Sequence, residues 1–142
     1  MDTNVLVAAL RSDQGASRQL LVAALDRRMA VLVSVPLMLE YEAVLTRPDQ
    51  LSETGLTSNE TNGVLDALVA VAEPVSLRFL WRPQLQDPSD EMVLATAVNG
   101  GADHLATFNV RHLRDVAMEF GVRAAPPADV LRELRGERHE KK

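Results

Sequence analysis

The sequence contains no cysteine. This absence excludes disulfides, thiolate metal ligands and a cysteine nucleophile, and it fits the reducing cytoplasm that we expect for this protein. Aromatic residues make up only 4% of the chain, so Trp81 and Tyr41 are interpreted as core or interface residues and not as a platform for nucleic-acid bases. No apolar run approaches the roughly 18 residues that span a bilayer, and no signal peptide begins the chain, so no membrane association is expected.

Basic residues are fewer than acidic ones. The 142 residues include 15 Lys and Arg against 20 Asp and Glu, a formal net charge of −5. Bulk electrostatics therefore do not favour nucleic-acid binding, which would need a metal ion and a local basic rim such as Arg11, Arg111 and Arg114. The length suits one domain, expected over residues 1–135, followed by a charged and frayed tail over residues 136–142.

Hydrophobic periodicity predicts strands and helices in alternation. A first helix should follow Asp2, and a helix that starts at Pro36 should end before Pro48. The other predicted helices cover residues 16–28, 58–72, 90–99, 110–120 and 127–135, the predicted strands cover residues 30–35, 75–80, 104–107 and 122–125, and residues 49–57 and 81–89 are interpreted as loops. This order predicts an α/β fold with a parallel sheet.

Acidic or amide side chains follow several of the predicted strands. Asp2, Glu40, Asp90 and Asn109 each lie at or shortly after a transition from strand to helix. Ligands of open parallel sheets bind beyond the carboxyl ends of the strands, so these side chains are expected at one rim.

Such a rim would favour one kind of chemistry. Carboxylates gathered in a cleft raise each other's pKa unless a cation lies among them, and oxygen ligands suit Mg²⁺ or Mn²⁺ better than zinc. Hard divalent ions with open positions activate water for the hydrolysis of phosphodiesters. The spacing therefore favours metal-dependent hydrolysis without a nucleophilic side chain.

Each of these residues also has a structural interpretation. Asp90 could be a helix N-cap, Glu40 a solvated helix residue and Asp87 a turn residue before Pro88. Thr107 and Asn109 could be an ordinary strand end and cap, Asp2 a disordered terminal residue, and Glu42 a surface residue. The histidines have no spacing typical of a ligand set and are interpreted as non-catalytic: His104, His112 and His139.

An ordered set of motifs resembles the PIN-domain family, in particular its bacterial branch of toxin–antitoxin toxins (VapC-like). The motifs are DTNVLVAAL at residues 2–10, SVPLMLEYEAVLTRP at residues 34–48 and DPSDEMVLATAVNGGADHLATFN at residues 87–109. The resemblance continues through the closing strand and helix to about residue 135.

The resemblance implies roles for individual residues. Asp2, Glu40 and Asp90 match the catalytic, metal-binding acids of the family. Asn109 stands where the family usually has a fourth acid and offers a carbonyl ligand without charge. The neighbouring acids that could compensate are Asp87 and Glu91, and the residues that would orient the acids are Thr3, Asn4 and Thr107.

The resemblance also implies a fold and a function. The fold is a three-layer α/β/α sandwich around a parallel sheet, with a truncated first strand because only Met1 precedes Asp2. The implied activity is that of a Mg²⁺- or Mn²⁺-dependent endoribonuclease that acts as a toxin on RNA, pairs with a cognate antitoxin and forms a homodimer. The alternative is a non-catalytic PIN-like module that binds RNA or protein through a degraded metal site. Nucleotide-dependent enzymes are disfavoured because the sequence has no phosphate-binding glycine motif.

Overall fold

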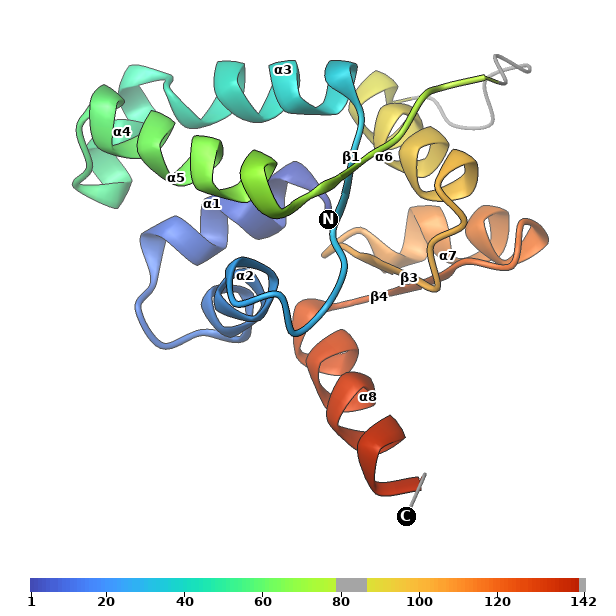
Figure 1. Cartoon of the computed structure of the whole chain (residues 1–142). Coiled ribbons are helices and arrows are strands. Elements are labelled where there is room, and N and C mark those ends of the chain that lie inside the picture. Colours follow the sequence, from blue (N-terminus) through green and yellow to red (C-terminus); the bar gives the residue numbers. More distant parts are fainter. Residues whose placement is uncertain (79–86, 141–142) are drawn as a thin grey trace.

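The computed structural model describes the backbone of residues 1–78 and 87–140 and the side chains as far as Arg135. Helices dominate, and the strands are short (Figure 1). In chain order the elements are α1 (Thr3–Arg11), α2 (Ala16–Leu25), β1 (Leu32–Val33), α3 (Val35–Leu45), α4 (Pro48–Thr54), α5 (Ser58–Val71), β2 (Glu73–Pro74), α6 (Pro88–Asn99), β3 (His104–Ala106), α7 (Val110–Glu119), β4 (Arg123–Ala125) and α8 (Pro127–Glu140).

The described strands form two separate parallel pairs instead of the single sheet that we expected. Strand β1 pairs with β2, with Leu32 opposite Glu73, and β3 pairs with β4, with Leu105 opposite Ala124. The amino end of the chain lies between the two pairs (Figure 1). It is connected to β3 by one backbone hydrogen bond of 2.9 Å, from the Asp2 N–H to the Ala106 carbonyl. The α/β class and the parallel pairing are thus confirmed, whereas a continuous sheet is not observed.

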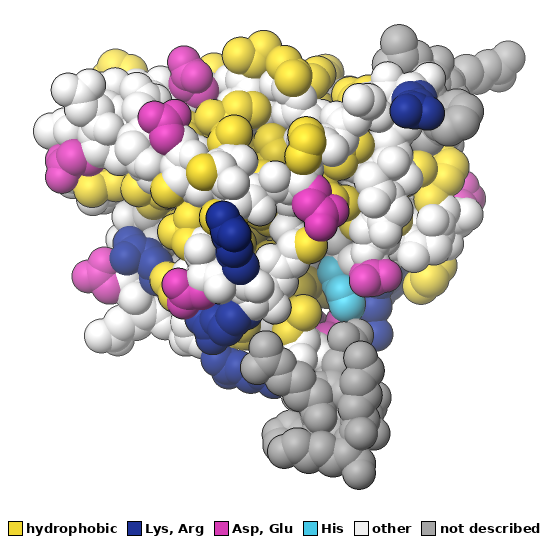
Figure 2. Space-filling model, viewed as in Figure 1, with side chains coloured by type: hydrophobic (Ala, Val, Ile, Leu, Met, Phe, Trp, Pro, Cys, Tyr) yellow, Lys and Arg dark blue, Asp and Glu magenta, His cyan; other side chains and the backbone are white. Residues whose placement is uncertain are grey.

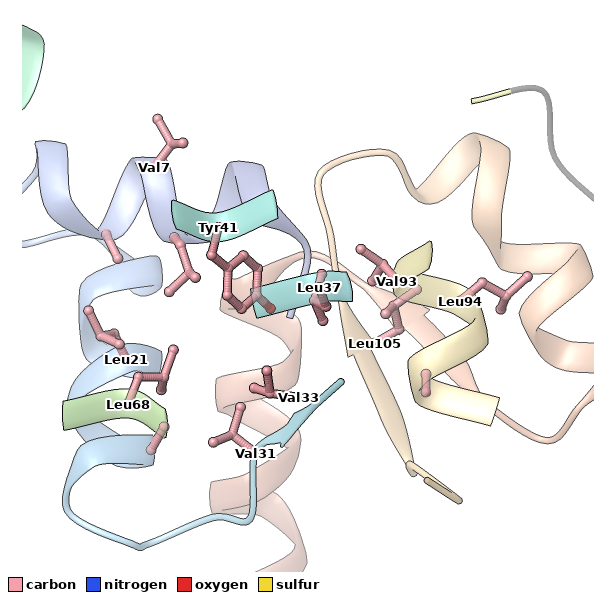
Figure 3. Close-up of a cluster of buried hydrophobic side chains, with 14 of the residues drawn as sticks. Val7, Leu21, Val31, Val33, Leu37, Tyr41, Leu68, Val93, Leu94 and Leu105 are labelled. Atoms are coloured by element: carbon pink, nitrogen blue, oxygen red, sulfur yellow. The ribbon is translucent and has the colours of Figure 1, made fainter. Parts of the chain in front are cut away.

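The main hydrophobic core lies between the helices and β1 and β3. Figure 3 shows Tyr41 and Leu37 of α3 in this cluster, close to Val33 of β1 and Leu105 of β3. Tyr41 has no exposed surface, so its interpretation as a core residue is confirmed. Burial of this aromatic ring contributes on the order of 2 kcal/mol to folding.

Helix α1 also packs on a second, smaller cluster. Val5 meets Leu20 of α2, Ala106 of β3 and Val130 of α8 there, while Leu6 on the same helix belongs to the main core. A helix that packs on two sides needs apolar residues around most of its circumference. This explains the almost uninterrupted apolar run that follows Asn4.

Several predicted boundaries were wrong. Residues 49–57 are not a continuous loop, because α4 begins at Pro48, where a proline suits the first turn of a helix. Of the strand expected at residues 75–80, residues 75–78 form no strand and residues 79–80 lie outside the described residues, while β2 lies just before them. Helix α8, which was expected to end at residue 135, continues to Glu140.

Part of the predicted loop at residues 81–89, including Trp81, lies outside the described residues, as does the side chain of His139. The described end of that loop already belongs to α6. Among the described helices, none combines the length and the hydrophobicity that crossing a bilayer requires.

Candidate active site

Asp2 precedes α1 and is held in place by Ala106, at the end of β3, and by Thr107, the residue after β3. Its side chain is only 3% exposed. One carboxylate oxygen of Asp2, Oδ2, accepts a hydrogen bond of 2.7 Å from the Thr107 hydroxyl. The backbone N–H of Asp2 donates to the Ala106 carbonyl. Asp2 is the N-cap residue of α1, but its side chain makes no capping bond. Its carboxylate is therefore oriented by Thr107 and not by the helix that it precedes, which excludes the interpretation of Asp2 as a disordered terminal residue.

Glu40 is held by two hydroxyl groups from different parts of the chain. Oε2 accepts a hydrogen bond of 2.9 Å from Thr3 on α1, and Oε1 accepts one from Ser89 on α6. Charge-assisted bonds of this kind are stronger than neutral ones and fix the carboxylate. Glu40 is only partly buried, whereas Glu42 on the same helix is exposed. Glu40 is therefore not an ordinary solvated helix residue, and the surface interpretation of Glu42 is confirmed.

Asp90 lies near Asp2, although the two residues are far apart in sequence. Its side chain is 7% exposed. Burial raises the pKa of the Asp90 carboxyl, and the negative charges of Asp2 and Asp87 raise it further. A hydrogen bond from the Asn109 side chain and the charge of His112 act in the opposite direction. The Asn109 side-chain amide thus favours the charged form of the Asp90 carboxyl.

Asp87, and not Asp90, is the N-cap residue of α6. The Asp87 carboxylate accepts a hydrogen bond of 2.8 Å from the Ser89 N–H, and Pro88 occupies the first turn. The interpretation of Asp90 as the cap is therefore wrong, and the interpretation of Asp87 as a structural turn residue is confirmed. Glu91 follows Asp90 in the first turn of the helix.

Thr107 and Asn109 lie at the end of a strand and the start of a helix, and both also act on the candidate acids. Thr107 follows the end of β3, has no exposed surface, and accepts a hydrogen bond of 2.9 Å from the Asn109 N–H. Asn109 is the N-cap residue of α7 without a capping bond from its own side chain. The Asn109 side chain instead acts on Asp90, whose pKa it lowers.

The remaining candidates are all exposed at the surface. Asn4 is exposed on α1 and makes no side-chain hydrogen bond with the described residues. Arg11 forms an ion pair of 3.0 Å with Glu53. Arg111 and Arg114 are exposed on α7, the helix that follows Asn109. Arg114 also forms an ion pair, of 3.8 Å, with the neighbouring Asp115, and Arg11 is paired at the other end of α1.

Three further residues contact the candidate acids or act on them, and nothing in the sequence pattern pointed to these contacts. Ser89 lies between two of the candidate acids in sequence, but its bond to Glu40 could be recognised only after α3 and α6 had been placed side by side. The Tyr41 hydroxyl donates to the Met1 carbonyl, next to Asp2. Burial and the charges of Asp2 and Glu40 raise the pKa of this hydroxyl. His112 was interpreted as non-catalytic, and it lies close enough to Asp90 to lower the pKa of that acid.

The arrangement brings oxygen ligands together without a preassembled metal cluster. Within the described ranges, no group of at least three His, Cys, Asp or Glu side chains is close enough to hold a metal ion. The donors that do meet are carboxylate, amide and hydroxyl oxygens, which are suited to hard cations. Mutual repulsion between Asp2 and Asp90 is also what a cation would relieve. The residues present are therefore compatible with Mg²⁺ or Mn²⁺.

The chain was compared with known families and proteins. The family model described as a PIN domain matches residues 1–111, and therefore covers the three acids and Asn109. No curated protein and no solved structure matches the chain significantly.

Proposed function

This chain belongs to the PIN-domain family, whose members are generally nucleases, and on that basis we propose that it is a Mg²⁺- or Mn²⁺-dependent endoribonuclease. The observation that carries this proposal is the pair formed by Asp2 and Asp90. Both carboxylates are largely buried, and the charge of one raises the pKa of the other. A cation bound between the two carboxylates would relieve this repulsion, which supports a metal site at this place.

Asp2, Glu40 and Asp90 would hold the ion, with the side-chain carbonyl of Asn109 as a neutral ligand. When bound, such an ion supplies an activated water molecule and stabilises the negative charge on the phosphate and the leaving oxygen. Hydroxyl groups of this chain orient two of the acids. Thr107 holds Asp2, while Thr3 and Ser89 hold Glu40, because metal sites tolerate little misplacement of their ligands.

The substrate that we propose is RNA. The chain carries a net charge of −5, so attraction of a phosphate backbone has to come from the ion and from local basic groups. Arg111 and Arg114 are exposed on α7, which begins next to Asn109. Arginine on this helix could contact phosphates that flank the scissile bond.

The biological role that we propose is that of a toxin in the cytoplasm, controlled by a cognate antitoxin and active as a homodimer. It is supported by the ordered motifs around Asp2, Glu40 and Asp90. Induced expression in a bacterial host would test it: a toxin arrests growth, and the same chain carrying Asp90→Asn does not.

Cleavage of a mixed RNA panel in the presence of Mn²⁺, Mg²⁺ or EDTA tests the nuclease activity. Glu40→Gln has a matched control in Glu42→Gln, because both acids lie on α3 and only Glu40 is held by hydroxyl groups. Asp90→Asn has its control in Asp66→Asn on the exposed side of α5. We expect metal-dependent cleavage that falls at least about 100-fold in Glu40→Gln and Asp90→Asn, and remains in both controls. Cleavage that survives both site substitutions would contradict the assignment.

Metal binding has a readout that does not depend on activity. A ligand that binds only the folded state raises the midpoint of thermal unfolding. Mn²⁺ should therefore raise the Tm of the wild-type chain and of Asp66→Asn, but not that of Asp90→Asn. An equal increase in all of them would place the ion elsewhere.

The second candidate function is a non-catalytic module that binds RNA or protein. It is favoured by the lack of charge on Asn109 and by the finding that the described acids form no three-residue metal cluster. Such a module would not cleave RNA under any condition, and its affinity for an RNA of the panel would be unchanged by Asp90→Asn and Glu40→Gln. The nuclease hypothesis predicts the opposite on both points.

A further inference from the structure

Phe108 is an exposed aromatic residue next to the candidate active site. Its side chain is 53% exposed and is not part of either hydrophobic cluster. Among the described residues, one other aromatic side chain is exposed, that of Phe120 at the opposite end of α7. Much of the Phe108 ring is therefore accessible to a ligand from solvent.

A backbone turn fixes the position of Phe108 relative to the acids. The Thr107 hydroxyl accepts a hydrogen bond of 2.9 Å from the Asn109 N–H, which is the pattern of a turn closed by a threonine side chain. The Thr107 side chain also bonds to Asp2, and that of Asn109 acts on Asp90. Consecutive Cα atoms lie about 3.8 Å apart, so the Phe108 backbone is one residue away from a contact to each acid. A nucleotide whose phosphate is bound at the two acids would lie within reach of the Phe108 ring.

Charge alone does not provide strong binding of RNA by this chain. The net charge is −5, and Figure 2 shows acidic and basic side chains interspersed over one face of the molecule. Near the site, Arg111 is exposed, lies three residues after Phe108, and makes no ion pair with a described residue. Stacking of a base on an aromatic ring does not depend on net charge, and it strengthens binding by roughly 5- to 100-fold per base. The Phe108 ring and the Arg111 guanidinium are thus suited to hold one base and one adjacent phosphate.

We propose that Phe108 stacks on the base of a nucleotide beside the scissile phosphate, and that this contact gives the chain a preference for a purine at that position. The inference rests on the nuclease function proposed above. A purine presents a larger ring surface than a pyrimidine, and differences in stacking strength produce modest sequence preferences of this kind. Arg111 contacts the phosphate of the flanking nucleotide.

The stacked position is found with RNA oligonucleotides that differ at one nucleotide. Starting from an RNA of the panel that the chain cleaves, each position next to the cleaved bond carries adenine, uracil or no base. The kcat and KM of the wild-type chain are measured with Mn²⁺. At one of these positions we expect removal of the base to raise KM about tenfold. Uracil should raise KM about threefold over adenine, and kcat should change less than KM.

Substitutions of Phe108 assign this effect to its ring. Phe108→Leu removes the ring and keeps an apolar side chain, so it should raise KM about tenfold for the adenine RNA. Removal of the base should then have little further effect, because the two groups that are lost contact each other. Phe108→Tyr retains a ring and should keep a KM close to the wild-type value. Phe120→Leu is the matched control, since it makes the same exchange at the other end of α7, and it should behave as the wild-type chain does.

Binding separates this inference from the proposed cleavage. Fluorescence anisotropy gives the Kd of the same RNAs with Ca²⁺ in place of Mn²⁺, because oxygen ligands also hold Ca²⁺. The Kd values should follow the pattern expected for KM. Binding with this pattern but without cleavage in Mn²⁺ would support the stacking contact and contradict the nuclease function.

Three outcomes would overturn the stacking contact. The first is cleavage in which removal of the base affects wild type and Phe108→Leu equally at every position, which would leave the nuclease function intact. The second is a KM of Phe108→Tyr as high as that of Phe108→Leu, since this would assign the effect to the turn and not to the ring. The third is a failure of the folded chain to bind any of these RNAs.

Discussion

Thr107 donates a hydrogen bond of 2.7 Å to the carboxylate of Asp2, although 105 positions separate the two residues in the chain. The same hydroxyl accepts a bond of 2.9 Å from the Asn109 N–H. A hydroxyl has one proton to donate and lone pairs to accept with, so both bonds form together. One buried side chain thus fixes the first acid of the candidate site and the start of α7.

Replacement of Thr107 by valine should damage both stability and activity. Valine keeps the shape but leaves the buried Asp2 carboxylate and the Asn109 N–H without this partner, which costs about 2 kcal/mol of unfolding free energy. Urea denaturation measures this loss, and RNA cleavage should fall with it because Asp2 is no longer oriented.

Thr107→Ser is the control, since serine retains the hydroxyl. Its unfolding free energy and its cleavage should lie much closer to the wild-type values than those of Thr107→Val. Equal losses in the two variants would mean that the methyl group, and not the hydrogen bond, matters at this position.

Replacement of Asp90 by asparagine should stabilise the metal-free protein while it abolishes cleavage. Burial and the neighbouring acids raise the pKa of Asp90 in the folded state. Between the ordinary carboxyl pKa of about 3.9 and the raised value, the folded protein binds more protons than the unfolded chain, so stability falls as the pH rises. Above the raised pKa, Asp90 is charged in the folded protein, and the full loss of unfolding free energy is present.

The measurement is the Tm in EDTA between pH 3.5 and pH 7.5. Asp90→Asn should melt a few degrees higher than the wild-type chain near neutral pH, and the difference should disappear at the acidic end. Asp66→Asn on α5 should reproduce the wild-type profile. A lower Tm of Asp90→Asn at neutral pH would show that the Asp90 carboxylate is compensated within the chain.

The sequence predicted the larger helices because their apolar residues recur at helical spacing. The start of α5 at Ser58 and that of α2 at Ala16 agree with the pattern. Helix α4 was missed because it contributes no buried residue and so has no apolar face to recognise. Strand β2 was misplaced because its position depends on pairing with β1, in which Leu32 is opposite Glu73. Local sequence carries no information about that register.

The acids of the candidate site could be predicted from the sequence, but the residues that contact them could not. Asp2, Glu40 and Asp90 each lie near the start of a predicted helix, which indicated a common rim. Ser89 and Tyr41 act through contacts with residues 49 and 40 positions away. Such contacts depend on how the helices pack, and neither periodicity nor capping preference specifies this packing.

Asp87 should tolerate asparagine but not alanine, because its carboxylate caps α6 through the Ser89 N–H. Asparagine caps as well as aspartate, whereas alanine at an N-cap costs about 1 kcal/mol. Urea denaturation should therefore separate the two variants by this amount. Cleavage should be largely retained in Asp87→Asn. A loss of cleavage in that variant, comparable with the loss in Asp90→Asn, would instead make Asp87 one of the metal-binding acids.

The Tyr41 hydroxyl donates a hydrogen bond to the Met1 carbonyl, next to Asp2. Tyr41→Phe keeps the buried ring and removes this bond, so the unfolding free energy should fall by about 1 kcal/mol. The loosened Met1 carbonyl also frees the backbone of Asp2, and cleavage should decrease more than the change in stability explains. The pH profile of cleavage below pH 9 should keep its shape, because burial and the neighbouring acids raise the pKa of Tyr41 above its ordinary range. If Tyr41→Phe cleaved RNA at the wild-type rate, the Thr107 hydrogen bond would be sufficient to position Asp2.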